Sequence, residues 1–233
     1  MQDDYQHKGP FVEARASATV VPLVDGPRGL EVLLLRRNRA LSFHGGDWVF
    51  PGGSVDAADA GAAGCAPGDE AACRRAAVRE AQEEASLVLS PDALVPLSHW
   101  TTPVSLPKRF ATWFFASEVR SRAVAIDGGE IRAHRWMRPA DALAARDAHE
   151  LGLPPPTFVT LDWLARFDRV AEAIEAARRR PPPRYLPRFR LLPEGVCCIY
   201  NDDAAYEDGD VERPGRRDRL WLSHERWRYE HDT

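Results

Sequence analysis

The stretch that decides the fold runs from residue 49 to residue 87 and reads VFPGGSVDAADAGAAGCAPGDEAACRRAAVREAQEEASL. It begins with a tight turn, because Pro51 fixes φ while Gly52 and Gly53 permit backbone angles that other residues avoid. It ends in helix formers without Gly or Pro, which predicts a helix over 69–87. The small, Gly-rich residues 56–68 lack periodicity and predict a surface insertion between turn and helix.

Three acidic residues share one face of this predicted helix. Glu80, Glu83 and Glu84 stand at i, i+3 and i+4, so like charges lie close together at a cost of a few tenths of a kcal/mol per exposed pair. A solvated acidic face is one interpretation. The other is a divalent-cation site, because hard carboxylate oxygens suit Mg²⁺ or Mn²⁺ and the glycine turn lets a backbone carbonyl approach the same ion. Arg79 could pair with one carboxylate and fix its rotamer.

The rest of the chain alternates between strand and helix patterns, which predicts the α/β class. The expected strands cover 16–24, 30–36, 110–119, 130–137, 188–200 and 218–222. The expected helices cover 139–146 and 158–179. The sequence RRRPPPR at 178–184 ends the second helix and predicts a division into a domain at 11–180 and a C-terminal extension at 181–233 that packs on it.

Composition excludes several classes of protein. The 233 residues are 44% hydrophobic and 28% charged with a formal charge of −4, values of a globular chain without a basic surface for nucleic acid or membranes. No apolar run approaches the ~18 residues of a membrane span. The N-terminal MQDDYQHKGP lacks the apolar core of a signal peptide. The cysteines at 65, 73, 197 and 198 fit no zinc spacing and are expected to be reduced thiols, so the predicted location is cytoplasmic.

Residues 49–87 resemble the signature of the Nudix hydrolases. That signature is Gly, five residues, Glu, seven residues, then Arg-Glu-U-X-Glu-Glu-X-Gly-U, where U is bulky and aliphatic. Gly53 matches its first glycine, and residues 79–87, REAQEEASL, match its second half. Ser86 stands in place of the second glycine, and Ala81 is small for its position. Counted back from Arg79, the early glutamate falls on Ala71, with Glu70 one place away.

The resemblance implies a fold and a chemistry. The fold would be the Nudix αβα sandwich, with a mixed curved sheet and helical and β additions toward the C-terminus. Mg²⁺ or Mn²⁺ would bind the carbonyl of Gly52 and the carboxylates of Glu80, Glu83 and Glu84, and loss of Glu83 would be the most damaging single change. Arg79 would orient Glu80. The general base would be Glu80 or Glu84, or else Glu130 outside the signature, which could equally be a solvated loop acid.

The segments at 32–61 and 98–116 resemble, more narrowly, the coenzyme A diphosphatase subgroup. The substrate would then be CoA or an acyl-CoA, cleaved to 3′,5′-ADP and (acyl-)4′-phosphopantetheine. The rival substrates are ADP-ribose, NADH and nucleotide sugars, and a rival function is a non-hydrolytic nucleotide sensor. The expected partner is thus a small nucleotide, with a homodimer possible. Four cations next to apolar strands are candidate phosphate ligands or merely charged strand ends: Arg36, Arg37, Lys108 and Arg109.

Overall fold

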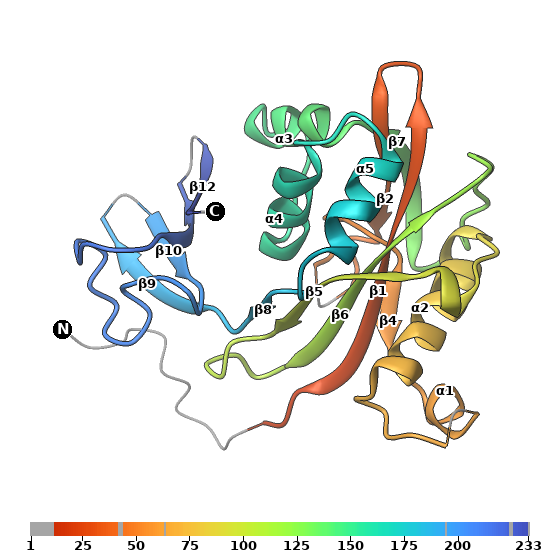
Figure 1. Ribbon diagram of the computed structural model, residues 1–233, viewed down its shortest axis with the longest axis horizontal. Helices are drawn as coiled ribbons and strands as arrows, with labels where there is room; N and C mark the ends of the chain where they lie inside the picture. Colours follow the sequence, from red (N-terminus) through yellow and green to blue (C-terminus); the bar gives the residue numbers. More distant parts are fainter. Residues whose placement is uncertain (1–11, 42–43, 63, 194, 224–225, 233) are drawn as a thin grey trace. The chain divides into compact units, whose positions relative to one another are not determined.

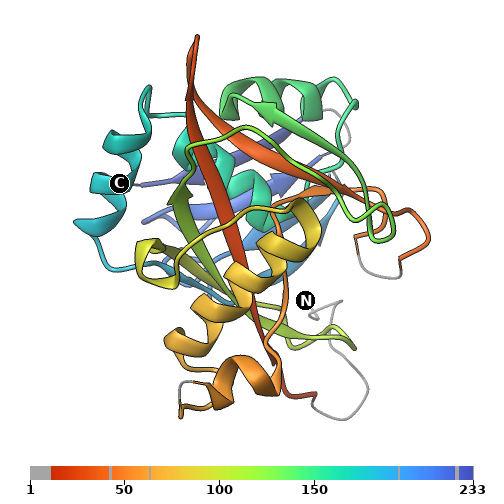
Figure 2. The same ribbon diagram turned by 90° about the vertical axis from the view of Figure 1, so that its right-hand side faces the viewer.

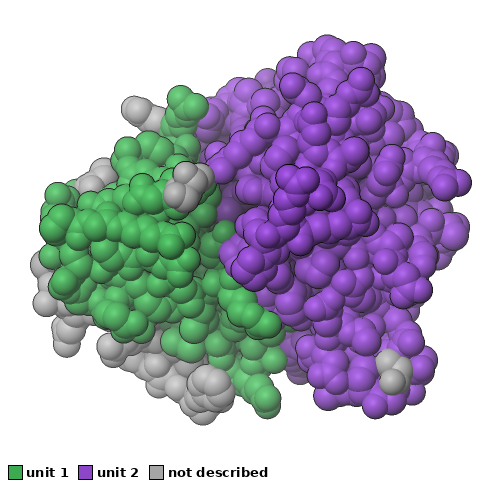
Figure 3. Space-filling model, in the orientation of Figure 1, with its two compact units in different colours: residues 1–14, 100–111, 184–233 green, residues 15–99, 112–183 purple. Residues whose placement is uncertain are grey.

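The structure is a computed structural model that describes residues 12–41, 44–62, 64–193, 195–223 and 226–232. Two compact units are distinguished in Figure 3. The larger comprises residues 15–99 and 112–183; the smaller comprises 1–14, 100–111 and 184–233. The proposed division into 11–180 and 181–233 stays a prediction.

The described chain contains twelve strands, five α-helices and one 3₁₀ helix. The first part forms β1 (Arg15–Gly26), β2 (Gly29–Arg37), β3 (Trp48–Val49), β4 (Gly52–Ser54), α1 (Ala57–Gly61), α2 (Glu70–Ala85), η1 (Pro91–Ala93), β5 (Val95–Thr101), β6 (Phe110–Glu118), β7 (Ile131–Met137), α3 (Pro139–Asp147), α4 (Pro155–Leu164) and α5 (Val170–Arg178). The last part forms β8 (Arg184–Tyr185), β9 (Arg188–Leu192), β10 (Gly195–Ile199), β11 (Asp218–Leu222) and β12 (Trp227–His231).

The main sheet has eight strands in the order β3-β2-β1-β6-β5-β8, with β4 also paired to β1 and β7 to β2. Figures 1 and 2 show α2 on one side of this sheet and α3 and α4 on the other. The predicted α/β class is therefore confirmed. No helix in the described part of the chain is both long and apolar enough to cross a membrane.

The core beneath α2 explains how the helix lies close to the sheet. Ala18 and Val20 of β1 and Leu33 and Leu35 of β2 alternate toward α2 and are fully buried. They pack against small side chains of α2, which let the helix approach the strands: Ala76, Ala77, Ala81 and Ala85. The small residue at position 81, which departs from the signature, is thus a packing residue with no exposed surface.

The end of α2 accounts for the other departure. Ser86 takes a left-handed conformation with φ of 56°, its N–H bonds to Gln82 O at 3.0 Å, and the N–H of Leu87 bonds to Ala81 O at 3.1 Å. This is the Schellman-type ending that glycine usually supplies. Serine performs it here at a conformational cost of about 1–2 kcal/mol.

The single helix predicted over 158–179 is wrong, because the segment forms two helices, α4 and α5. Two backbone groups at the break form hydrogen bonds with the β1–β2 hairpin, whereas in a continuous helix they would bond within the helix. The side chain of Asp25 accepts the N–H of Val170 at 2.9 Å, and the carbonyl of Asp168 accepts the N–H of Leu30 at 2.8 Å. The apolar spacing continues across the break, so periodicity alone did not reveal it.

The smaller unit contains a second sheet, in the order β12-β11-β10-β9. The predicted strand region 188–200 is a hairpin of β9 and β10, and β12 was not predicted. Arg219 belongs to β11, and its guanidinium donates two hydrogen bonds to the Asp203 carboxylate, at 2.6 and 2.7 Å. Both side chains are almost completely buried, at 1% and 0% exposed, so this ion pair is isolated from water.

Candidate functional site

The glycine turn and the Glu80 side chain of α2 lie very close together. A Cβ added to Gly53 would lie 2.3 Å from Oε1 of Glu80, so any larger residue at position 53 would displace the Glu80 carboxylate from its present place. The backbone N–H of Gly52 donates to Oε2 of Glu84 at 2.9 Å. The Pro-Gly-Gly turn therefore brings the backbone directly against two of the three predicted ligands.

The carbonyl of Gly52 lies on the same edge of β4 as the N–H that binds Glu84. Gly52 is opposite Thr19 of β1, and the neighbouring N–H of Val20 bonds to Pro51 O at 2.9 Å. Since hydrogen-bonded and non-hydrogen-bonded pairs alternate in an antiparallel ladder, both backbone groups of Gly52 face away from β1. The carbonyl of Gly52 therefore faces the same side as Glu84, where it could bind a cation together with the carboxylates.

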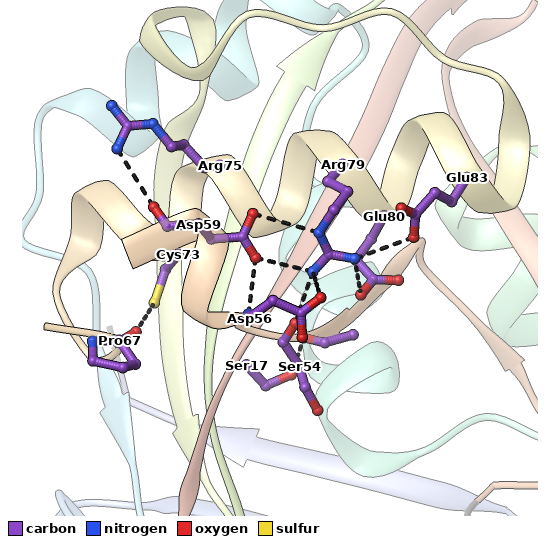
Figure 4. Close-up of polar contacts among 11 residues, drawn as sticks. Ser17, Ser54, Asp56, Asp59, Pro67, Cys73, Arg75, Arg79, Glu80 and Glu83 are labelled. Carbon is purple, nitrogen blue, oxygen red and sulfur yellow. Dashed lines mark hydrogen bonds and ion pairs between the residues drawn. The ribbon is translucent and has the colours of Figure 1, made fainter. Parts of the chain in front are cut away.

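Arg79 is the centre of the polar network around α2 (Figure 4). One Nη group donates to Glu80 at 2.9 Å and Glu83 at 3.1 Å, and the other donates to the carbonyl of Ser54 at 2.9 Å. Burial by itself lowers the pKa of Arg79, but the bonds to Asp59 and Glu80 outweigh it and raise that pKa. The guanidinium therefore fixes two glutamate side chains relative to the strand that carries the glycine turn.

Asp59 of α1 is the residue that sequence reasoning missed. Its carboxylate accepts Nη2 and Nε of Arg79 at 3.0 and 3.4 Å, and its side chain is only 7% exposed. Counted forward from Gly53, the signature places its early acid at residue 59; counting back from Arg79 hid this, because the extra residues lie between Asp59 and Arg79. Glu70, one place from the expected position, instead pairs with Arg74 at 2.7 Å.

The segment 56–68 is consequently more than an aperiodic surface insertion. Its beginning forms α1, where Asp59 and Ala60 are buried and the side chain of Asp59 accepts the N–H of Asp56 at 2.9 Å. The carbonyl of Pro67 lies 3.7 Å from Sγ of Cys73 on α2. Both ends of the segment therefore contact α2.

Asp59→Asn is expected to lower the free energy of unfolding by about 1–3 kcal/mol, because the partly buried guanidinium of Arg79 loses its charged acceptor. Urea denaturation measures this loss. The control is Asp162→Asn, whose partner Arg166 lies just after the end of α4, with side chains 32% and 37% exposed, and it should change stability by less than about 0.5 kcal/mol. Equal stability of Asp59→Asn and the unsubstituted protein would contradict the role given to Asp59.

Buried carboxylates dominate the electrostatics of the site. Burial raises the pKa of Glu84 to about 8, partly opposed by the Gly52 N–H and by Arg37, and reinforced by Glu80 and Glu130. Burial likewise raises the pKa of Glu80, with Arg79 opposing it. A partly buried group of acids that raise one another's pKa values provides an environment that a cation would stabilise.

The carboxylates do not converge on one point in this structure. Among the residues that the structure describes, no three His, Cys, Asp or Glu side chains are grouped as a metal site. Glu80 and Glu83 bond to Arg79 and Glu84 bonds to Gly52, so each carboxylate has a protein partner. The set nevertheless fits Mg²⁺ or Mn²⁺ chemically, because every donor is a hard oxygen.

Arg37 and Glu130 lie together at the edge of this site. Nη2 of Arg37 donates to Oε1 of Glu130 at 2.6 Å, and both residues influence the pKa of Glu84. Arg36 points to the opposite face of β2, where its guanidinium lies 6.0 Å from the ring centre of Trp48. The structure thus brings Arg37 to the glutamates and separates Arg36 from them.

Lys108 and Arg109 belong to the smaller unit, so their predicted contact with phosphate stays a prediction. Arg109 is only 5% exposed, and it donates to the carbonyls of Thr102 at 3.1 Å and Val12 at 2.7 Å. The ammonium of Lys108 lies 5.5 Å from the ring centre of Phe110. Within its own unit, Arg109 therefore ties two backbone segments together.

Comparison with known proteins places this geometry in a family. The NUDIX domain model matches residues 14–160. The acyl-coenzyme A diphosphatase NUDT19 of Xenopus laevis is 30% identical over 128 residues, which cover 51% of this chain and 34% of that protein. Its Homo sapiens counterpart is 31% identical over 135 residues, covering 54% and 36%. The matched region thus spans about a third of the length of these relatives.

A solved structure agrees with the fold. The crystal structure of a NUDIX hydrolase from Alicyclobacillus acidocaldarius has a TM-score of 0.61 and 25% sequence identity, covering 70% of this chain and 96% of that one. The family match spans more than half of the sequence and includes both the glycine turn and α2. The chain therefore belongs to the Nudix hydrolases, a family of enzymes that hydrolyse diphosphate bonds.

Proposed function

We propose that this protein is a divalent-metal-dependent hydrolase that cleaves the diphosphate bond of a nucleoside diphosphate linked to another moiety. The observation that carries the proposal is the contact of the glycine turn with Glu80 and Glu84. Glycine lets the backbone of the turn approach the carboxylates closely. Backbone and carboxylate oxygens can then bind the same ion.

Glu80, Glu83, Glu84 and the carbonyl of Gly52 would hold Mg²⁺ or Mn²⁺. The ion would offset the charge that develops on the diphosphate during hydrolysis. Arg79 orients two of the carboxylates through its paired hydrogen bonds, and Asp59 holds Arg79 in turn. The chain would thus supply hard oxygen ligands from one helix and the adjoining turn, and these would gather around the ion when it binds.

The favoured substrate is CoA or an acyl-CoA, with 3′,5′-ADP and (acyl-)4′-phosphopantetheine as products. The support is the similarity to two proteins named acyl-coenzyme A diphosphatase. ADP-ribose, NADH and nucleotide sugars are the rival substrates. The protein would act as a cytoplasmic enzyme, and α5 or another surface could support a homodimer.

A substrate panel tests this proposal. Purified protein is incubated with CoA, an acyl-CoA, ADP-ribose, NADH and a nucleotide sugar in the presence of Mg²⁺ or Mn²⁺, and products are resolved by chromatography. We expect 3′,5′-ADP from the first two. Turnover of ADP-ribose or NADH without turnover of CoA would reject the CoA assignment. Binding without turnover in either metal would instead indicate a non-hydrolytic nucleotide sensor.

Removal of the metal is expected to abolish hydrolysis. EDTA should stop product formation, and excess Mg²⁺ or Mn²⁺ should restore it. A second measurement is thermal unfolding without substrate, since an ion present at 100 times its dissociation constant stabilises the folded state by about 2.7 kcal/mol. Activity that persists after exhaustive chelation would contradict the metal requirement.

A further inference from the structure

Two arginines contact the ring of Trp48 on the face of the main sheet that is turned away from α2. Arg36 of β2 is the register partner of Trp48 of β3, and its Cζ lies 6.0 Å from the ring centre. Arg135 of β7 reaches the same ring, with its Cζ at 5.0 Å from the centre. Two positive charges are therefore gathered around one aromatic side chain.

The register of three strands produces this arrangement. Successive side chains point to opposite faces of a strand, so Arg36 points away from α2, toward which Leu33 and Leu35 point. Arg135 is the partner of Leu34 across the β2–β7 ladder, and Leu34 lies on the same face as Arg36. The sheet thus separates the two arginines from the glutamates of α2.

Neither guanidinium is neutralised by a carboxylate. Within the described ranges of the chain, Arg36 and Arg135 form no hydrogen bond and no ion pair, and each contacts the ring of Trp48. A ring face attracts a cation but supplies no oxygen acceptor for its N–H groups. The acid next to the tryptophan, Asp47, is already bonded to Nδ1 of His44 at 3.0 Å.

Trp48 is itself held firmly. It is only 4% exposed, and its backbone N–H donates to Gly152 O at 2.8 Å in the connection between α3 and α4. Arg36 is partly buried and Arg135 is exposed, so an ion from solvent can reach the pair. Two like charges near one fixed ring repel each other, and an anion between them would remove that repulsion.

We propose that Arg36 and Arg135 form a binding site for a phosphate group, on the opposite face of the sheet from the glutamate site. A guanidinium suits phosphate because it donates two parallel N–H bonds to a pair of oxygens. Two guanidiniums match the two negative charges of a phosphate dianion. The ligand is orthophosphate or the phosphomonoester of a small molecule. No bond is made or broken at this site, so the inference goes beyond the proposed hydrolase function and does not depend on it.

Binding of orthophosphate to the purified full chain tests this inference. Titration calorimetry is performed in EDTA, so that no divalent cation can hold phosphate at the glutamates. The variants are Arg36→Met, Arg135→Met, the double variant and Arg36→Lys. The matched control is Arg132→Met, which removes the same charge from an exposed position on the same strand, β7. Thermal unfolding checks that each variant is folded.

Orthophosphate is expected to bind the unsubstituted protein, with an affinity that falls as the salt concentration rises. Each single Met variant should raise the dissociation constant about tenfold or more, because a charge-assisted hydrogen bond is lost. The double variant should show no measurable binding. Arg36→Lys should recover only part of the affinity, since an ammonium lacks the paired donors. Arg132→Met should keep the constant within about twofold, because salt screens an exposed charge outside the site.

The same titration with adenosine monophosphate distinguishes the two sources of the phosphate group. Tighter binding than that of orthophosphate, lost in the double variant, assigns the site to a phosphomonoester ligand. Weaker or equal binding assigns it to free phosphate.

Two kinds of result would overturn the inference. One is that millimolar orthophosphate does not bind the unsubstituted protein, or that it binds the double variant equally well. The other is equal weakening by Arg132→Met and Arg135→Met, which would mean that the general charge of β7 attracts the ion. Hydrolysis is measured separately in the substrate panel, so failure of this inference and failure of the proposed function are distinguishable.

Discussion

Glu83→Gln is expected to lower kcat by about 10³-fold, the equivalent of about 4 kcal/mol of transition-state stabilisation. Several kcal/mol of such stabilisation come from a metal ion that polarises a phosphoryl group, and a neutral amide is a poor substitute for a carboxylate ligand. The side chain is 58% exposed and bonded to Arg79 one turn away, so the change should leave the fold intact.

The matched control is Glu175→Gln. Glu175 is also an exposed helix glutamate bonded to an arginine one turn away, at 3.0 Å, but it lies on α5. Steady-state kinetics of both variants with Mg²⁺ provide the comparison, and the control should retain full activity. Undiminished turnover in Glu83→Gln would show that the acidic face of α2 is not the metal site.

Asp203→Ala is expected to destabilise the protein by about 3–5 kcal/mol, because it leaves the buried guanidinium of Arg219 without its carboxylate. Chemical denaturation measures the change. The adjacent residue provides the control: Asp202 pairs with Arg216 at the surface, with side chains 61% and 57% exposed, so Asp202→Ala should cost less than about 1 kcal/mol.

The same pair predicts a pH dependence. Burial alone raises the pKa of Asp203, but hydrogen bonds from Arg219 and two backbone N–H groups outweigh it and hold the pKa below the ordinary value of 3.8. Because the pKa of Asp203 is lower in the folded state than in the unfolded state, its ionised form stabilises the fold at any pH above the unfolded-state pKa. This contribution is lost progressively as the pH falls below about 4. Asp203→Ala should therefore flatten the acid side of the stability profile; an unchanged slope would contradict the assignment.

The site could be predicted from the sequence where its parts are local. The spacing of Glu80, Glu83 and Glu84 on one helix, and the glycine turn before it, are written within residues 49–87. Asp59 was also within reach, but it required counting forward from Gly53. The pairing of Arg37 with Glu130 could not be predicted from the sequence, because it depends on the register of β2 against β7. That register includes a bulge between residues 36 and 37.

The same distinction applies to the fold. The hairpin of β1 and β2 and the helix α2 follow from turn residues and apolar periodicity, and both are confirmed. The break between α4 and α5 depends on the distant side chain of Asp25, and short strands such as β3 and β4 have too few residues to show a pattern. Tertiary hydrogen bonds decided these elements, and local propensity did not specify them.

The segment between Asp59 and Glu70 has a practical consequence. The segment is anchored at both ends, by α1 and by the start of α2. For a flexible loop between fixed ends, the free-energy cost of closure grows only with the logarithm of the loop length, about 0.6 kcal/mol per doubling. A reporter peptide or fluorophore-carrying graft placed after Gly61 should thus be tolerated. It would give an optical readout a short distance in sequence from the Arg79 network without altering any of its members.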